Sequence, residues 1–185
     1  LRRQIAESLE RLVRQNYVAR HGDNYAFLTD EEQDIAIDIR NTPVDSAAIV
    51  QSIGHTIFSE IYPSKKFKYK KYDFAYDQYV DETIIGPAAG GVRLRFVTAA
   101  GDYTEAAEFK LVADSLANSE AIILLSGEAQ YFEQIETAAK IRKYIKQKNV
   151  SQLPETIQEI IRKQQARARS LEDSAKALIE RAIAD

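Results

Sequence analysis

The spacing of apolar residues changes from helical to alternating at Phe67, and this change constrains the fold more than any other feature of the sequence. Downstream of it, four apolar residues fall on one face of an extended strand: Tyr72, Phe74, Tyr76 and Val80. Phe67 and Tyr69 have the opposite parity, so we expect a turn or bulge near Lys70 and Lys71. A sheet therefore begins in this part of the chain.

The residues that follow predict an α/β layer. We expect a strand at 92–98, a helix at about 104–117, a strand at 121–126 and a helix at about 128–148. The run AIILL within the second strand is apolar throughout, which is typical of a strand covered on both faces. A strand–helix–strand connection of this length predicts that the two strands are parallel and that the crossover between them is right-handed. Residues 63–150 are thus predicted to form a small mixed-sheet α/β domain.

The start of the chain predicts a helix, a hairpin and a second helix. Apolar residues recur at helical spacing over 1–15, and two short runs at 17–20 and 25–28 flank the turn-forming residues 21–24. Thr29 and Glu32 then form a capping box, so the next helix starts near Asp30. This order is the back half of a winged helix without its first helices.

Two further helices are predicted. Thr42 as N-cap, Pro43 and Asp45 open a helix that ends before Pro63. It buries a stripe of Ile49, Val50, Ile53, Ile57 and Ile61. A long helix fills 151–185, where the apolar spacing approaches a heptad with a stutter around Gln164 and leaves coiled-coil pairing open.

The predicted fold class is accordingly α+β or α/β, with three segments. Residues 1–62 hold the partial winged helix and the following helix, 63–150 the sheet, and 151–185 the start of a helical arm.

Composition narrows the classes of protein. The chain has 185 residues, 45% of them hydrophobic, with a net charge of −3, which argues against a wholly basic nucleic-acid binder. It has no cysteine, and no apolar run approaches the ~18 residues of a membrane span. These features fit a cytoplasmic protein with no membrane association. The chain has no methionine and opens inside a helical pattern, so we expect it to be a segment of a longer protein.

The sequence shows no catalytic, metal-binding or cofactor-binding constellation. The glycine-rich loop at 86–91 continues with Val92 and Arg93, where a P-loop needs Lys and Ser or Thr. The strand acids Asp73, Asp77 and Asp81 are spaced roughly 13 Å apart, too far for one ion, which favours a solvated polar face. His21 and His55, the two histidines, lack ligand spacing.

One place remains for a small-molecule pocket, at the carboxyl ends of the parallel strands. Asp102 and Ser126 lie there, and both are also explained as helix N-caps. We therefore expect no enzymatic activity of these residues themselves.

Two groups of basic residues are candidates for nucleic-acid contact. In SKKFKYKKY, Lys66, Lys68 and Lys70 have the composition expected of phosphate contacts beside stacking aromatics. The alternative is that the lysines discourage pairing at a strand edge, with Phe67 and Tyr69 in the core.

The second group surrounds the partial winged helix: Arg2, Arg3, Arg11 and Arg14 on the first helix, with Arg20 and His21 at the wing. Here the alternative is a module that only packs against its neighbours.

Four segments together resemble one family. They are LERLVRQNYVARHGDNYAFLTDEEQDI, IRNTPVDSAAIVQSIGHTIFSEIY, KFKYKKYDFAYDQYVDETIIG and IRKYIKQKNVSQLPETIQEIIR. The family is the large P-loop ATPase of bacterial BREX phage-defence systems, of the BrxC/PglY type. The resemblance runs through almost the whole chain, and FLTDEEQDI and KNVSQLPETIQ are its most distinctive phrases.

The resemblance implies a long cytoplasmic protein with an AAA-like region upstream that binds ATP and Mg²⁺. It implies partners in a defence assembly that includes a DNA methyltransferase, and an association with DNA. No residue here matches the family's Walker motifs, so this segment resembles the region that follows the ATPase core.

Three functions follow from these observations. The first is a non-catalytic interaction or regulatory region of such an ATPase. The second is a winged-helix transcription regulator with an effector-binding α/β domain and a dimerising helix. The third is an enzyme with a pocket near Asp102 and Ser126, for which no nucleophile–base pair is visible.

Overall fold

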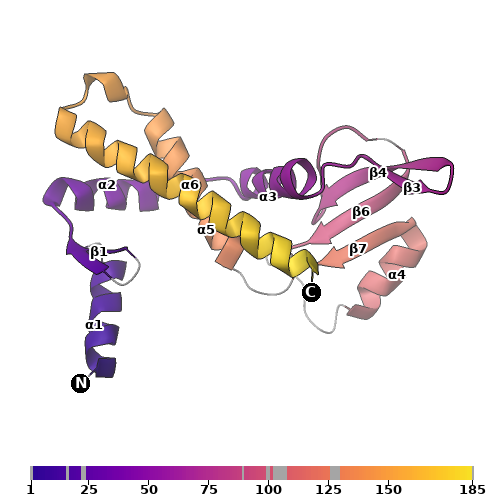
Figure 1. The fold of residues 1–185 in the computed structure, drawn as a ribbon, viewed down its shortest axis with the longest axis horizontal. Helices are drawn as coiled ribbons and strands as arrows, with labels where there is room; N and C mark the ends of the chain where they lie inside the picture. The colour runs from indigo at the N-terminus through magenta and orange to yellow at the C-terminus, as the bar shows by residue number, and fades with distance from the viewer. Residues whose placement is uncertain are drawn as a thin grey trace. The chain divides into compact units, whose positions relative to one another are not determined.

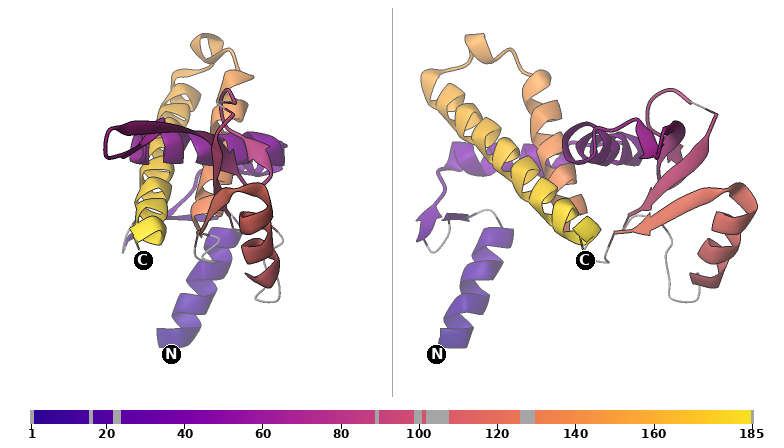
Figure 2. Two further views of the ribbon diagram at one scale, coloured as in Figure 1. Left: turned by 90° about the vertical axis from the view of Figure 1, so that its right-hand side faces the viewer. Right: turned by 45° about the vertical axis from the view of Figure 1, so that its right-hand side comes forward.

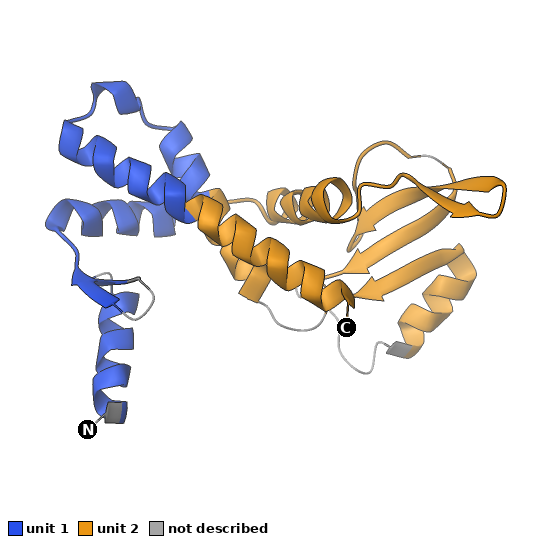
Figure 3. Ribbon diagram, viewed as in Figure 1, with its two compact units in different colours: residues 1–43, 140–167 blue, residues 44–139, 168–185 orange. Residues whose placement is uncertain are grey.

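The computed structural model describes residues 2–15, 17–21, 24–88, 90–98, 101, 108–125 and 130–184. These residues group into two compact units, each built from two separate segments (Figure 3). Unit 1 consists of Leu1–Pro43 and Lys140–Arg167, and unit 2 of Val44–Ala139 and Ala168–Asp185. No helix in the described ranges is both long and apolar enough to span a bilayer.

Unit 1 is helical apart from one hairpin. It contains helices α1 (Arg2–Arg14) and α2 (Asp30–Asn41), and strands β1 (Val18–His21) and β2 (Asn24–Phe27) pair antiparallel between them. The end of α5 (Gln130–Lys146), the 3₁₀ turn η3 (Val150–Gln152) and the start of α6 (Glu155–Ala184) complete it. The predicted order of helix, hairpin and helix is confirmed.

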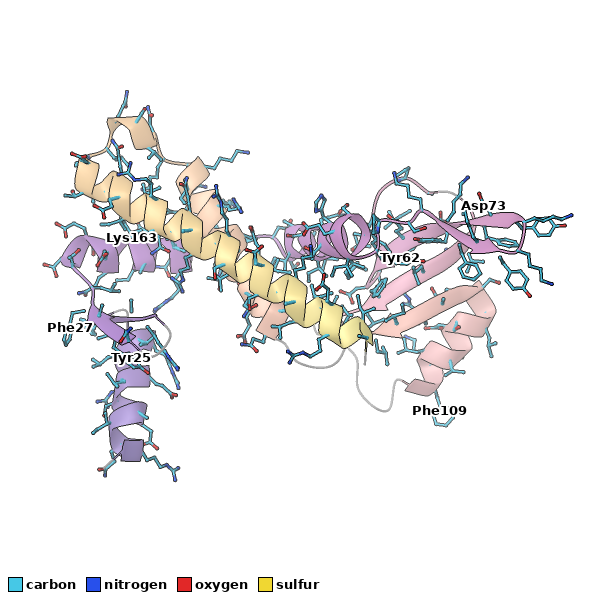
Figure 4. All side chains as sticks on the ribbon, viewed as in Figure 1. Tyr25, Phe27, Tyr62, Asp73, Phe109 and Lys163 are labelled. Carbon is cyan, nitrogen blue, oxygen red and sulfur yellow. The ribbon has the colours of Figure 1, made fainter. Side chains whose placement is uncertain are left out.

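The helices of unit 1 begin and connect through specific polar contacts. The predicted capping box is present: Glu32 N donates to Thr29 Oγ1 at 3.3 Å, and Thr29 N donates to Glu32 Oε2 at 3.1 Å. Arg40 donates to the carbonyl of Arg14 at 2.7 Å, which ties α2 to α1. Lys163 in α6, labelled in Figure 4, lies 3.6 Å from a carboxylate oxygen of Glu32.

The predicted N-cap at Thr42 is wrong. Thr42 ends α2 as its C-cap, and its hydroxyl donates to the carbonyl of Asp38 at 2.8 Å. The next helix, α3 (Ser46–His55), is capped by Asp45, whose Oδ1 accepts from the amide of Ala47 at 3.0 Å. The aspartate is the better cap because its charged oxygen also faces the positive end of the helix dipole.

Unit 2 is built on a mixed five-stranded sheet (Figure 1). Its strands are β3 (Lys66–Tyr69), β4 (Tyr72–Val80), β5 (Thr83–Ile84), β6 (Val92–Val97) and β7 (Glu120–Leu124). The order is β3-β4-β6-β7, and β5 pairs with β4. The predicted turn at Lys70 and Lys71 joins β3 to β4. The predicted parallel pair, β6 and β7, is also confirmed, with α4 (Glu108–Asn118) between them in sequence.

The prediction that AIILL is covered on both faces is wrong. β7 is the last strand of the sheet order, and Leu124 is 39% exposed. An uninterrupted apolar run does not show whether other elements cover one face of the strand or both. In the two views of Figure 2, α4 lies beside this edge.

Helices cover one face of the sheet. The face packs against α3, its π-helical continuation η1 (Thr56–Ile61), the start of α5 and the end of α6. Gly54 allows the close approach of α3, because a Cβ there would lie 2.4 Å from Ile85 Cδ1. The predicted stripe of α3 and η1 is confirmed: Ile53 and Ile57 are fully buried, and the helix ends before Pro63.

The long C-terminal helix is confirmed as α6, which has 30 residues. Its buried positions include Ile161, Ala168, Ala175 and Ile179, so contacts within this chain use much of its apolar stripe. The two buried alanines allow neighbouring elements to approach closely.

Candidate interaction surface on the sheet

Two pairs of exposed aromatic side chains form a ladder on the β3–β4 hairpin. Phe67 lies opposite Phe74, and Tyr69 opposite Tyr72, so that all four side chains share one face of the sheet. They are 57%, 49%, 55% and 56% exposed in that order. The alternative that placed Phe67 and Tyr69 in the core is therefore wrong. The hairpin extends past the helices that cover the rest of this face (Figure 1).

An apolar groove of about 490 Å³ continues from the aromatic ladder across the same face. Its main lining residues come from all four strands of the sheet order, η1 and the end of α6: Phe67, Phe74, Leu94, Ile123, Ile61 and Ile183. Tyr62, labelled in Figure 4, also lines it. A second hollow, of about 500 Å³, shares Tyr62 and Phe67 and is lined by three lysines: Lys65, Lys66 and Lys68.

Tyr62 is held in place through β4. Its ring stacks on Tyr76 with centroids 6.3 Å apart, and the Tyr76 hydroxyl donates to the carbonyl of Ser64. Burial of the Tyr76 side chain, and after it the proximity of Tyr62, raises the pKa of Tyr76 above its ordinary value. A tyrosine hydroxyl is protonated at neutral pH, and the raised pKa extends its role as a donor into more alkaline solution.

The three lysines predicted for nucleic-acid contact all lie on this hairpin. Lys66 and Lys68 alternate with the aromatics on β3, and Lys66 Nζ lies 4.0 Å from Asp73. Lys70 occupies the turn with φ 56°, and its Nζ lies 5.3 Å from the ring centroid of Tyr69. Lys71 is placed similarly, with its Nζ 5.4 Å from the ring centroid of Tyr72. Aromatic and basic residues are thus brought to one projection of the sheet.

The predicted basic residues of unit 1 lie on α1 and β1. Arg11 and Arg14 are exposed on α1, where Arg14 lies 3.8 Å from Glu10. Arg20 on β1 lies 5.8 Å from the ring centroid of Tyr25. Arg3 pairs with Glu7 at 3.0 Å. The side chains of Arg2 and His21 lie outside the described part of the structure.

The opposite face of the sheet contains a buried ion pair, Arg95 with Glu120, that sequence reasoning missed; the exposed Glu82 also contacts Arg95. Arg95 in β6 lies 2.6 Å from Glu82 and 2.7 Å from Glu120, and the side chains of Arg95 and Glu120 are both buried. The signal was present, because Arg95 and Glu120 are charged residues within or beside apolar strands. They lie close together because β6 pairs with β7, and the residue pattern of one strand does not predict its pairing with another.

The three strand acids have separate partners. Asp73 lies near Lys66, Asp77 accepts from the amide of Gly90 at 3.0 Å, and Asp81 accepts from both Thr98 N and Thr98 Oγ1 at 2.8 Å. The solvated-face interpretation is wrong for Asp77, which is 8% exposed, because this carboxylate holds the loop before β6. Within the described ranges, no three His, Cys, Asp or Glu side chains converge as a metal site would require.

The other positions considered for chemistry have structural contacts or lie outside the described ranges. His55 is exposed and lies 3.8 Å from Glu60. Gly91 lies against the backbone of β4, where a Cβ would be 2.1 Å from the carbonyl oxygen of Ala75, so the glycine-rich loop closes onto the sheet. Asp102 and Ser126 are both outside the described residues.

The comparisons identify a family from the sequence. No solved structure matches this chain. A family model matches residues 42–185, and its description is "BREX ATP-binding protein BrxC 4th domain with six-stranded beta sheet". The match includes all of unit 2, in which the described residues form a sheet of five strands. The chain therefore belongs to the family of the fourth domain of BrxC, the ATP-binding protein of BREX phage-defence systems.

Proposed function

We propose that this domain is a non-catalytic interaction region of its BREX ATPase and that the aromatic hairpin and groove bind another protein of the defence system. The observation that supports the proposal is the exposure of four large aromatic side chains beside an apolar groove. Single exposed apolar side chains are common on the surfaces of folded domains. A contiguous apolar patch is not, and it marks an interaction site.

The polar groups of unit 2 support a structural rather than a chemical role. Asp45 caps a helix, Asp77 and Asp81 hold backbone amides, and Arg95 neutralises Glu120. A catalytic site needs a nucleophile or base that is free to act on a substrate. In the proposed scheme, other parts of the ATPase bind and hydrolyse ATP, and this domain contributes contacts to partners.

Co-purification tests the proposal. The full-length ATPase that contains this chain, with Phe67→Ser and Phe74→Ser, should co-purify with smaller amounts of the other BREX proteins than the unchanged ATPase does. Protection of the host against phage should fall with it. Both residues are about half exposed, so the substitutions leave the core intact.

Phe109→Ser on α4 is the matched control, because it removes an aromatic side chain that is 88% exposed elsewhere in unit 2. Unchanged co-purification and protection in the double variant would refute the proposal. Loss in the control as well would mean that the effect is not specific to the hairpin.

A second candidate is DNA contact by unit 1, in which the helix and hairpin act as part of a winged helix. Its support is the exposure of Arg11, Arg14 and Arg20 on one helix and the adjoining hairpin. Each phosphate contact adds to the salt dependence of binding, so Ala at these three positions should flatten the slope of log K against log salt. Duplex binding that does not change with salt would remove this candidate.

A further inference from the structure

We infer that the groove on unit 2 takes the apolar face of an amphipathic, acidic helix from another polypeptide. The inference rests on the proposed function and specifies the chemistry of the partner. Three properties of the surface support it: the direction of the groove, the polarity of its lining, and the charge beside it.

The groove has the length and neighbours of a helix site. It crosses β3, β4, β6 and β7, and three strand spacings amount to about 14 Å. A helix of about nine residues has that length. The adjacent part of the same face is already covered by helices, and Ile61 of η1 and Ile183 of α6 form one side of the groove. A further helix would continue the layer.

The apolar lining favours side chains over nucleobases. The lining residues are almost all apolar, so the polar edges of a base buried there would lose their hydrogen bonds to water without replacement. Lysine Nζ atoms already lie over the rings of Tyr69 and Tyr72. A helix that presents apolar residues at i, i+3 and i+7 buries no unpaired polar group, which is the usual mode of helix-in-groove recognition.

The charge beside the groove selects acidic residues. Five lysines occur between Ser64 and Tyr72. Lys66 and Lys68 alternate with the aromatics and lie on the opposite face of β3, whereas the Nζ atoms of Lys70 and Lys71 lie over the Tyr69 and Tyr72 rings of the ladder. Lys65 lines the hollow that shares Tyr62 and Phe67 with the groove. Among the ion pairs of the described residues, Asp73 is the carboxylate that faces these lysines, and it pairs with Lys66. A partner helix with Glu or Asp along one border of its apolar face would meet the remaining positive charge, which favours that partner over a basic one.

Matched peptides test the inference on the 185-residue chain. The first is a labelled 12-residue helical peptide with Leu at i, i+3 and i+7 and Glu beside the leucines; its twin carries Lys in place of Glu. A third peptide has the composition of the first with the leucines distributed around the helix. Measured by fluorescence anisotropy at low salt, the acidic peptide should bind at least about tenfold more tightly than either of the other peptides. Its preference over the basic twin should decrease as salt is added, because salt screens the charges.

Variants assign the binding to the surface. Phe67→Ser with Phe74→Ser should weaken the acidic peptide by about tenfold or more, because each ring loses its burial against the peptide. Lys70→Glu with Lys71→Glu should reverse the preference in favour of the basic twin, because both Nζ atoms lie over rings of the aromatic ladder. Phe109→Ser should change neither affinity.

The same binding experiments distinguish other possible ligands of the groove. Equal affinity for the acidic and basic peptides, or for the rearranged peptide, overturns the inference. Binding of single-stranded oligo-dT, but not of the acidic peptide, would identify a nucleic-acid surface. Concentration-dependent self-association, abolished by Leu116→Asp at an exposed position of α4, would identify a second copy of this chain.

The two proposals fail separately. If the hairpin substitutions abolish co-purification of BREX proteins while the acidic peptide shows no preference, the docking surface stands and the partner chemistry is wrong.

Discussion

At the scale of single residues, Arg95 shows how much a fold can depend on one buried charge. It lies between Glu82 and Glu120, and its Nε has no hydrogen-bond partner among the described residues. A buried ion pair adds little net stability because both groups lose their hydration, but the loss of one partner leaves the other uncompensated.

Arg95→Met should therefore destabilise the protein by about 3–5 kcal/mol, because Glu120 would stay buried without its counter-ion. Adding Glu120→Leu should recover most of that loss. Urea denaturation of both variants measures the difference, and equal stability of the single and double variants would contradict this account of the cluster.

Tyr76 gives a prediction for alkaline pH. Because its pKa in the fold is raised, mainly by burial, the folded protein holds this proton more tightly than the unfolded chain does. The stabilisation is complete below the unfolded pKa of about 10 and is lost as the pH rises through the folded pKa. Tyr76→Phe should make the free energy of unfolding depend less steeply on pH above about 10. An unchanged slope would assign the alkaline sensitivity to other groups, such as Tyr144, whose pKa is also raised by burial.

Single residues also show where sequence reasoning failed. The stretch Thr42 to Asp45 contains two good caps three residues apart, and local preference does not decide which of them ends one helix and which opens the next. Arg95 and Glu120 meet only through strand pairing, so no local pattern contains their contact.

At the scale of elements, the order of helices and strands could be predicted because periodicity is a local property. The capping box at Thr29, the turn at Lys70 and the parallel β6 and β7 all followed from short stretches of sequence. What covers each element could not be predicted in this way. Alternation placed the hairpin aromatics on one face, but it did not show that the covering helices stop before Phe67 and Tyr69.

A substitution at Gly91 tests how closely the glycine-rich loop packs against β4. Gly91→Ala should destabilise the protein by about 1–3 kcal/mol, because the new Cβ meets backbone that cannot rotate away. Ala88→Ser is the control, since Ala88 is exposed in the same loop. Thermal melts of both variants compare the two effects, and equal melting temperatures would show that the loop moves aside at little cost.

At the scale of the molecule, each unit draws on segments that are far apart in sequence. The core of unit 2 combines α3, the sheet and the last turns of α6, where Ala175 and Ile179 are fully buried. Local periodicity cannot show which distant helix covers which sheet, so this pairing was beyond prediction from the sequence.

Truncation after Arg167 tests that pairing. Because the shortened chain keeps the sheet but loses Ala175 and Ile179, it should expose the apolar face of unit 2 and bind the dye ANS strongly. Glu180→Gln in the full chain is the control, because Glu180 is exposed, and this variant should bind little dye. If the truncated chain binds no more dye than the full chain, the last turns of α6 are dispensable for covering the sheet.

The late position of those turns has a consequence for biosynthesis. A ribosome adds about 5–20 residues per second, so the strands emerge on the order of seconds before Ala175 and Ile179 are available. During that interval the last turns of α6 do not yet cover the apolar face of the sheet. Newly made chains should accordingly depend on chaperones that bind exposed apolar surface, more so when translation pauses between β7 and the final helix.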